Sequence, residues 1–312
     1  MAIMPKSGRP SRPMLLPGVR VVRRDSEHLQ VGLGERRVVA ADTPDVRALL
    51  AALADAAAAI GDHAIEPGAG PAAGLRDLLV ARELLVDGAA ALGALTSAAE
   101  RSDPHHVAAT LSECGDDGPR VLADRKACAV EVADSSAAAE GAACRQLLDR
   151  AGFRAATGQV AGPRPAVGLL VSRGEPGREL VDGWLRDDIP HLVVTCVEAR
   201  VTVGPFVVPG RTPCLRCIDA HRAERDPRHA LVVEQYAGTS AGLVPEPVPL
   251  DLWGIALHWA VRDVATWVAG GRPRTWAATI VVDPRLELPE TRWRPHAGCG
   301  CGWPQAIPGR VG

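Results

Sequence analysis

Four cysteines in two short pairs are the residues of this chain whose spacing most clearly supports chemistry. Cys214 and Cys217 form a C-x-x-C pair, Cys299 and Cys301 form a C-x-C pair, and about 80 residues separate the two. A structural Zn²⁺ ion takes four thiolates in a tetrahedron, and two chelating pairs on tight turns supply them with little strain. The spacing therefore predicts a structural zinc site that joins distant parts of the chain.

Turn-forming residues beside both pairs favour the metal site. Pro213 precedes the first pair, and Gly298, Gly300 and Gly302 surround the second, which suits knuckle-like turns. One alternative is two unrelated pairs of buried thiols, because free cysteine is among the most buried side chains. The other is a catalytic zinc in which His296 replaces one cysteine, since four protein ligands leave no open position for water.

The other cysteines and histidines lack such a pattern. Cys196, after an apolar stretch, is the best placed nucleophile, but a reactive thiolate needs a base or a positive field that the sequence does not identify. It is interpreted as a structural thiol together with Cys114, Cys128 and Cys144. Three histidines have no metal-ligand spacing and are interpreted as surface or core residues: His221, His229 and His258.

Composition and charge limit the classes of function. A chain of 312 residues with 47% hydrophobic content is expected to fold into two domains. The net charge of −2 gives no basic surface for nucleic acid. The apolar stretch Leu250–Ala269 contains His258, Arg262 and Asp263, so it is too polar to face lipid, and no membrane partner is expected.

The first 17 residues give the expected location of the protein. Residues 1–17 are basic and proline-rich, without the apolar run of a signal peptide, and are predicted to form a disordered tail. With no export signal, the protein is expected in the cytoplasm, where its eight cysteines would be reduced thiols and metal ligands.

Residues 18–88 change from strand patterns to helix patterns. Alternating apolar residues predict three strands around Val19–Val22, Leu29–Leu33 and Val38–Val39. The run Asp42-Thr43-Pro44 predicts a helix start, and a second amphipathic helix follows from Leu75 through Gly88. A three-stranded ribbon followed by helices predicts a small winged-helix domain.

Three short runs of this domain resemble the PqqD-like recognition element, which binds leader peptides of ribosomally made, modified peptides. They are Pro17-Gly-Val-Arg, Asp42-Thr-Pro and Arg82-Glu-Leu-Leu-Val-Asp-Gly88. The resemblance implies that a leader peptide adds as a strand beside the third strand, with a helix as the opposite wall. The implied peptide-binding residues are Arg36, Arg37, Val38, Val39, Leu75, Leu78, Leu79 and Arg82. The alternative is that the leucines form the core of the domain.

Residues 89–124 have weak periodicity and are predicted to be a linker with one helix. Residues 125–312 alternate short apolar strands with helices, with strands at 127–133, 166–171 and 191–196 and helices at 137–150 and 179–186. This alternation predicts a Rossmann-like α/β sheet. In the N-terminal domain, the middle helix of the PqqD-like family is hard to identify between residues 55 and 74.

The second domain closely resembles the ThiF-like adenylating fold, in the branch associated with thiazole and oxazole peptide biosynthesis. The resemblance lies in the run from Val203 to Pro227, VGPFVVPGRTPCLRCIDAHRAERDP, and in the second cysteine pair. It implies a structural zinc and, in active members, adenylation of a carboxylate by ATP. In such a fold a helix like Leu250–Ala269 can lie at a homodimer interface, although its apolar face also fits core packing.

The residues that would bind ATP are missing. The Gly-x-Gly-x-x-Gly turn falls on Ser136, Ala138 and Gly141, so only the third glycine remains to let backbone amides approach phosphate. The ribose-binding acid has no equivalent in 154–159, and the metal-binding aspartate falls at Ser172 or Arg173. The chain has only two lysines, Lys6 and Lys126, and the family's phosphate-facing lysine has no equivalent. ATP is therefore not an expected cofactor.

Together these features predict a non-catalytic subunit. It would recruit a precursor leader peptide and present it to a YcaO-type cyclodehydratase in azole or azoline peptide biosynthesis. Two alternatives remain: an active ATP-dependent ThiF-like adenylyltransferase, and a zinc-stabilised structural or regulatory subunit.

Overall fold

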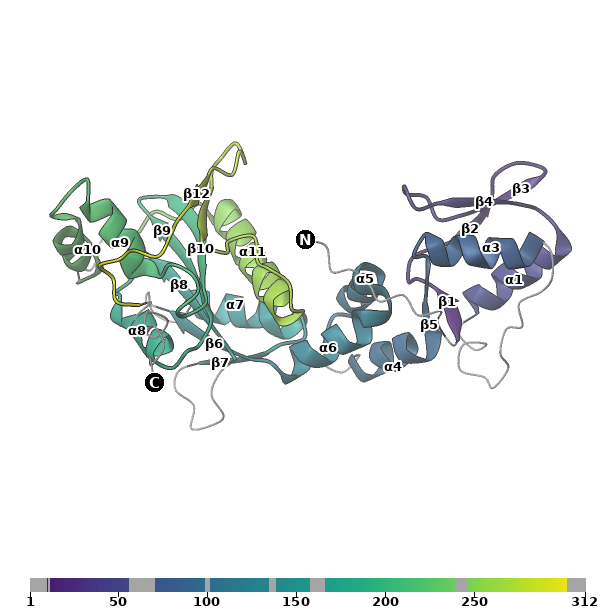
Figure 1. The fold of residues 1–312 in the computed structure, drawn as a ribbon, viewed down its shortest axis with the longest axis horizontal. Helices are drawn as coiled ribbons and strands as arrows, with labels where there is room; N and C mark the ends of the chain where they lie inside the picture. The colour runs from purple at the N-terminus through teal and green to yellow at the C-terminus, as the bar shows by residue number, and fades with distance from the viewer. Residues whose placement is uncertain are drawn as a thin grey trace, which may run out of the picture. The chain divides into compact units, whose positions relative to one another are not determined.

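The computed structural model describes residues 10, 12–55, 71–98, 102–134, 139–157, 166–238 and 246–301. The chain divides into two compact units, residues 2–124 and residues 125–312. Within the described ranges, no helix combines the length and the apolar character that crossing a membrane requires. Each unit is considered separately (Figure 1).

The N-terminal unit contains an antiparallel three-stranded sheet in the order β2-β3-β4. The strands are β2 (Val21–Arg23), β3 (His28–Val31) and β4 (Val38–Ala41), and helices α1 (Pro44–Ala54) and α3 (Pro71–Ala81) follow. Thr43 caps α1 by accepting a hydrogen bond from the Val46 N–H, and Pro44 occupies the first turn. Leu29, Val31 and Val38 pack with apolar residues of both helices in one core.

The tail predicted over residues 1–17 is wrong for its last residues. Strand β1 (Pro13–Leu15) pairs antiparallel with β5 (Leu85–Asp87). Met14, Leu15 and Leu16 are buried, so this apolar run belongs to the core. The end of the second helix is also corrected, since α3 stops at Ala81 and the run after it forms β5.

The linker predicted over residues 89–124 with one helix contains more regular structure. Helices α4 (Gly88–Ala98), α5 (Pro104–Cys114) and α6 (Gly118–Ala127) cover it, with a short 3₁₀ turn, η1, at Gly115–Asp117. Val107 and Leu111 of α5 pack with Met14 and Val86 in a second small core. These helices therefore extend the fold of the N-terminal unit. Residues 55–74, where the middle helix of the PqqD-like family is hard to identify, lie mostly outside the described residues.

The C-terminal unit contains a seven-stranded mixed sheet in the order β12-β11-β10-β9-β8-β6-β7. Strands β7, β6, β8 and β9 are parallel, and β10, β11 and β12 continue the sheet antiparallel. The strand bounds are β6 (Ala129–Asp134), β7 (Arg154–Thr157), β8 (Val167–Arg173), β9 (His191–Val197), β10 (Arg200–Val207), β11 (Ala278–Val282) and β12 (Glu290–Arg292).

Helices cover both faces of this sheet, as a parallel sheet requires. The helices are α7 (Ala139–Arg150), α8 (Glu179–Arg186), α9 (Leu215–Ala223), α10 (His229–Gly238) and α11 (Leu250–Val268). Leu169 and Val171 of β8 pack with α7 and α11, whereas Leu170 between them packs with Trp184 of α8. Gly168 makes room for that indole, because a Cβ there would lie 2.5 Å from the Trp184 ring.

Candidate metal centre, nucleotide region and peptide-binding edge

The four paired cysteines converge in the C-terminal unit. Their sulfur atoms all lie within 4.8 Å of one another. The Sγ–Sγ distances are 3.8 Å between Cys214 and Cys217, 3.5 Å between Cys214 and Cys299, and 3.2 Å between Cys217 and Cys301. A tetrahedral ZnS₄ centre with bonds of about 2.3 Å has sulfur atoms about 3.8 Å apart. The cluster could therefore hold one metal ion after a small expansion.

Two elements position the sulfur atoms. Cys214 is the N-cap of α9 and Cys217 lies in its first turn, so the helix dipole favours negative charge on both. The other pair lies on a turn in which Gly300 has φ +76° and the Cys299 N–H donates to the His296 carbonyl. Cys214 and Cys217 are fully buried among Val207 and Leu185. The predicted ligand set is thus brought together from residues 214–217 and 299–301.

Hydrogen bonding among the four cysteines shifts the pKa values of their thiols. The thiol of Cys214 donates to Cys217, which raises the pKa of Cys214 and lowers the pKa of Cys217. Burial raises the pKa of Cys299. Four thiolates this close are compatible only if a cation compensates their charge, and a soft or borderline divalent metal such as Zn²⁺ matches sulfur ligands.

His296 is not a replacement ligand. Its backbone N–H donates to Cys217 Sγ at 3.4 Å, and its ring Nδ1 accepts from the Gly298 N–H at 3.0 Å. Its Nε2 therefore carries the proton and donates to Glu224 at 3.1 Å. The ring orients the turn beside the cluster, and the catalytic-zinc alternative with His296 as ligand lacks geometric support.

His221, Glu224 and His296 form a second group whose ligand atoms lie within 4.8 Å of one another. His221 Nε2 faces the Arg294 carbonyl at 2.9 Å, so it too must donate its proton. Both rings thus donate their Nε2 protons to oxygen atoms. The group is a hydrogen-bonded network and not a set of open metal ligands.

Three of the remaining cysteines have the character of structural thiols. Burial raises the pKa of Cys128 to about 11, that of Cys144 to about 12 and that of Cys196 to about 11. A reactive cysteine needs the opposite shift, because the thiolate is the nucleophile. Cys114 is half-buried in α5.

The turn after β6 is where a ThiF-like fold would hold ATP. Ser136 and Ala138 lie outside the described residues. Gly141, in the first turn of α7, donates its N–H to Asp134 Oδ2 at 2.8 Å. A Cβ on Gly141 would lie 3.2 Å from Asp134 Cβ and 2.9 Å from an Arg145 nitrogen. The glycine thus makes room for an internal carboxylate at the position where a phosphate would approach the helix.

Sequence reasoning missed Asp134. The signal for it is an acidic residue at the end of a strand directly before a degenerate phosphate loop. At the end of β8, where the metal-binding aspartate would stand, Ser172 is buried and donates its hydroxyl to the Gly174 carbonyl at 2.9 Å. The end of β8 thus offers no carboxylate at Ser172 or Arg173 for a magnesium ion.

Strand β4 presents an edge of the N-terminal sheet to solvent. Within the described residues it pairs only with β3, in the register Leu29–Ala40 and Val31–Val38. The Asp42 N–H donates to the Glu27 carbonyl at 2.7 Å, so by alternation Ala40 and Val38 bond to β3. The backbone of Val39 therefore faces the open edge, where another strand can add.

The predicted peptide-binding residues divide between core and surface. Val38, Leu75 and Leu79 are buried, at 6%, 3% and 0% exposure, and belong to the core of the unit. The structure thus assigns Leu75 and Leu79 to packing, which corrects their interpretation as a contact surface. Val39 and Leu78 are 41% and 49% exposed, and Arg37 and Arg82 are also exposed. Arg36 is held by Glu83, whose carbonyl accepts from it at 3.2 Å.

Comparison with solved structures finds the same fold at low sequence identity. A heterocyclase in complex with substrate and cofactor matches with a TM-score of 0.63 and 20% identity, over 95% of this chain and 40% of that one. The heterocyclase TruD matches with a TM-score of 0.59 and 19% identity, over 94% of this chain and 43% of the TruD chain. MccB from E. coli, with selenomethionine MccA, matches with a TM-score of 0.57 and 12% identity, over 93% of this chain and 99% of the MccB chain.

The chain therefore spans less than half of the two heterocyclase chains and nearly all of MccB. No family model and no curated protein matches the sequence. The likeness confirms the mixed α/β fold that the sequence predicts. At these identities it describes the fold alone.

Proposed function

We propose that this chain is a non-catalytic subunit that recruits the leader of a precursor peptide and presents the peptide to a YcaO-type cyclodehydratase. The N-terminal unit would bind the leader by strand addition. The C-terminal unit, a zinc-stabilised ThiF-like fold, would dock on the partner enzyme. The pathway would be the biosynthesis of azole- or azoline-containing ribosomal peptides.

The edge of β4 that pairs with no described strand carries this proposal. The Val39 N–H and carbonyl face outward, and the exposed side chains of Val39 and Leu78 provide apolar surface on the strand and on α3. Main-chain hydrogen bonds of an added strand provide affinity without requiring a deep pocket. A leader captured here would raise the local concentration of its core peptide at the partner enzyme.

The described residues of the C-terminal unit do not favour adenylation. Asp134 already satisfies the Gly141 N–H, and its carboxylate would repel a triphosphate at the same position. The thiol cluster offers four protein ligands and no position for a reacting water. We therefore assign Zn²⁺ a stabilising role and expect ATP to be absent from the cycle of this chain.

The heterocyclase likeness supports the pathway. This chain corresponds to 40% and 43% of the two heterocyclases, so the cyclodehydratase activity would be supplied by a different polypeptide segment or chain. The MccB structure, which contains MccA, supports a peptide as the bound partner.

The test is binding of a fluorescein-labelled leader from the precursor peptide encoded beside this gene. Fluorescence anisotropy is compared for the wild type, Val39→Pro on β4 and Arg23→Pro on β2. Proline at 39 removes an N–H that no described residue of the unit uses, so the unit should still fold. The loss of that bond should weaken binding about tenfold or more.

Arg23→Pro is the matched control, because the Arg23 N–H also faces an open edge of the same sheet. The Gly32 N–H donates to Arg20 O and the Arg24 N–H to His28 O, so by alternation Val22 bonds to β3 and Arg23 does not. This variant should bind the leader like the wild type. Equal affinity of all three proteins, or no binding to any, would reject peptide capture at β4.

A solved structure of MccB with ATP is also similar to this chain, and it favours ATP-dependent adenylation as a second candidate. It predicts pyrophosphate exchange into ATP that depends on a peptide carboxylate and Mg²⁺. Exchange above background with the purified chain would replace the proposal of a non-catalytic subunit.

A further inference from the structure

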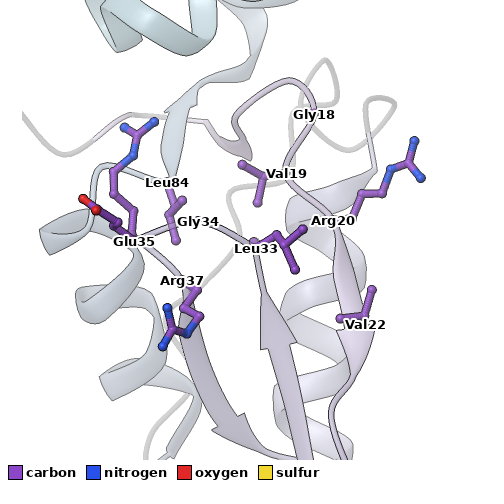
Figure 2. Close-up of a pocket in the computed structure, with 11 residues that line it drawn as sticks. Gly18, Val19, Arg20, Val22, Leu33, Gly34, Glu35, Arg37 and Leu84 are labelled. Carbon is purple, nitrogen blue, oxygen red and sulfur yellow. The ribbon is translucent and has the colours of Figure 1, made fainter.

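A pocket of 680 Å³ lies at one end of the N-terminal sheet. Its walls are the segment that enters β2 and the loop that joins β3 to β4, and Leu84 lies at its base (Figure 2). It is distinct from the contact surface of β4 and α3, because none of Val39, Leu75, Leu78 or Leu79 lines it. Its volume is sufficient for several side chains of a bound peptide.

The interior of the pocket is apolar. Val19, Val22, Leu33 and Leu84 line it, and the side chains of Val19, Leu33 and Leu84 lie at its centre in Figure 2. Leu33 is 88% exposed and Val22 is 47% exposed. Two large apolar side chains left this open beside a concave surface mark a place where an apolar group gains by binding.

The rim of the pocket is positively charged. Arg20 lies on one side, and Glu35 and Arg37 lie on the other (Figure 2). Among the described residues Arg20 and Arg37 have no ion-pair partner, whereas Arg36 lies 4.0 Å from Glu83. Two unpaired guanidinium groups against the single carboxylate of Glu35 favour an anionic group on the ligand.

The pocket lies next to the first residue of β4. Arg37 directly precedes Val38, the first residue of β4, and also lines the pocket. A peptide strand that pairs with Val39 and continues past Arg37 would therefore reach the pocket. Successive side chains of a strand point to opposite faces, so one side chain can enter while a neighbour reaches the rim.

We propose that this pocket binds an aliphatic side chain of the peptide that is followed or preceded by an acidic residue. The aliphatic group would contact Leu33 and Leu84, and the carboxylate would bind Arg20 or Arg37. This inference rests on the proposed capture of a peptide at β4 and adds the chemistry by which that peptide is selected.

The probe is a panel of four fluorescein-labelled peptides of twelve residues. They share one sequence of serine, threonine and valine and differ only in a central Leu-Asp, Leu-Lys, Ser-Asp or Ser-Lys pair. For the wild type, anisotropy should give at least tenfold tighter binding of the Leu-Asp peptide than of the Leu-Lys and Ser-Asp peptides.

Charge reversal makes the test specific. The double variant Arg20→Glu/Arg37→Glu should prefer Leu-Lys over Leu-Asp, a reversal that general damage to the fold cannot produce. Arg186→Glu/Arg285→Glu, on the C-terminal unit, changes the net charge equally and should keep the wild-type preference. Leu33→Ser should lose the preference for leucine over serine, and its exposed position leaves the core intact.

The outcomes separate the two levels of the proposal. If the natural leader binds and depends on Val39, but the panel shows no preference or the reversal fails, the pocket assignment is wrong while peptide capture stands. If the leader does not bind but the panel behaves as described, the pocket recognises peptides and the proposed function is wrong. If neither binds, both are rejected.

Discussion

Lowering the pH from 7.5 to 5 is expected to destabilise the C-terminal unit, because His191 is buried there in its neutral form. The side chain has 0% exposure at the start of β9, and its Nδ1–H donates to the Ile189 carbonyl at 3.0 Å. Its Nε2 has no hydrogen-bond partner among the described residues, and its ring lies 5.5 Å from the Trp184 ring. Burial lowers the pKa of His191 to about 4.

The sign and size of the effect follow from proton linkage. As the pH falls below the ordinary histidine pKa of about 6.5, His191 binds a proton in the unfolded chain. In the folded unit it stays neutral down to about pH 4. The free energy of unfolding therefore decreases as the pH falls through this window, and it is unaffected above it. With these two pKa values the loss at pH 5 is about 2 kcal/mol.

The assay is urea unfolding of the wild type and of His191→Leu at pH 7.5, 6 and 5, with excess zinc present. Leucine is similar in volume and cannot titrate. The effect of leucine on packing is the same at each pH. Any loss of metal in acid affects both proteins and cancels in the difference between their free energies of unfolding. That difference should shift by about 2 kcal/mol in favour of the variant between pH 7.5 and 5.

Ile189→Val provides the control, because it changes the neighbouring buried residue without removing a titratable group. Its difference from the wild type should be independent of pH. A constant difference for His191→Leu as well would mean that His191 becomes protonated within the folded unit, and the reasoning from burial would be refuted.

Three further outcomes are expected. Cys217→Ser should lose the bound zinc, measured by elemental analysis of the purified protein, and should lower the melting temperature of the C-terminal unit; an unchanged metal content would exclude the site. Leu79→Ala should destabilise the N-terminal unit by about 2–5 kcal/mol, whereas Leu78→Ala should cost under about 1 kcal/mol but weaken leader binding. Asp134→Ala should not bind Mg²⁺-ATP in calorimetry; binding would mean that the carboxylate alone masks an intact nucleotide site.

Local signals in the sequence predict the elements whose partners are close along the chain. Thr43 and Pro44 fix the start of α1 because a cap and a first-turn proline act within one helical turn. Strand β1 was missed because its partner β5 lies about 70 residues away and only three residues pair. The same pairing turns the end of the predicted second helix into a strand, since tertiary contacts override helical propensity there.

The candidate sites likewise divide into features that local sequence predicts and features that depend on distant contacts. The spacing of the four cysteines is enough to predict that their sulfur atoms converge, because chelating pairs carry their own geometry. For Leu75 and Leu79 the sequence leaves two roles open, groove wall and core, since a helix with leucines on several positions does not reveal which side faces the sheet. The pocket beside Leu33 was also hidden, because it depends on how two loops and Leu84 meet.

Asp134 connects the sequence departures in the phosphate loop to the proposed role. The N–H groups at the start of a helix need an acceptor, and in a nucleotide-binding enzyme the ligand's phosphate supplies it. Here the Asp134 carboxylate, at the end of the preceding strand, accepts one of them, the Gly141 N–H, without any ligand. Under the proposed function, a fold that does not hold ATP keeps its sheet and its cysteine cluster as a docking body. Selection on such a chain would then act on its binding surfaces, the edge of β4 and the pocket beside it.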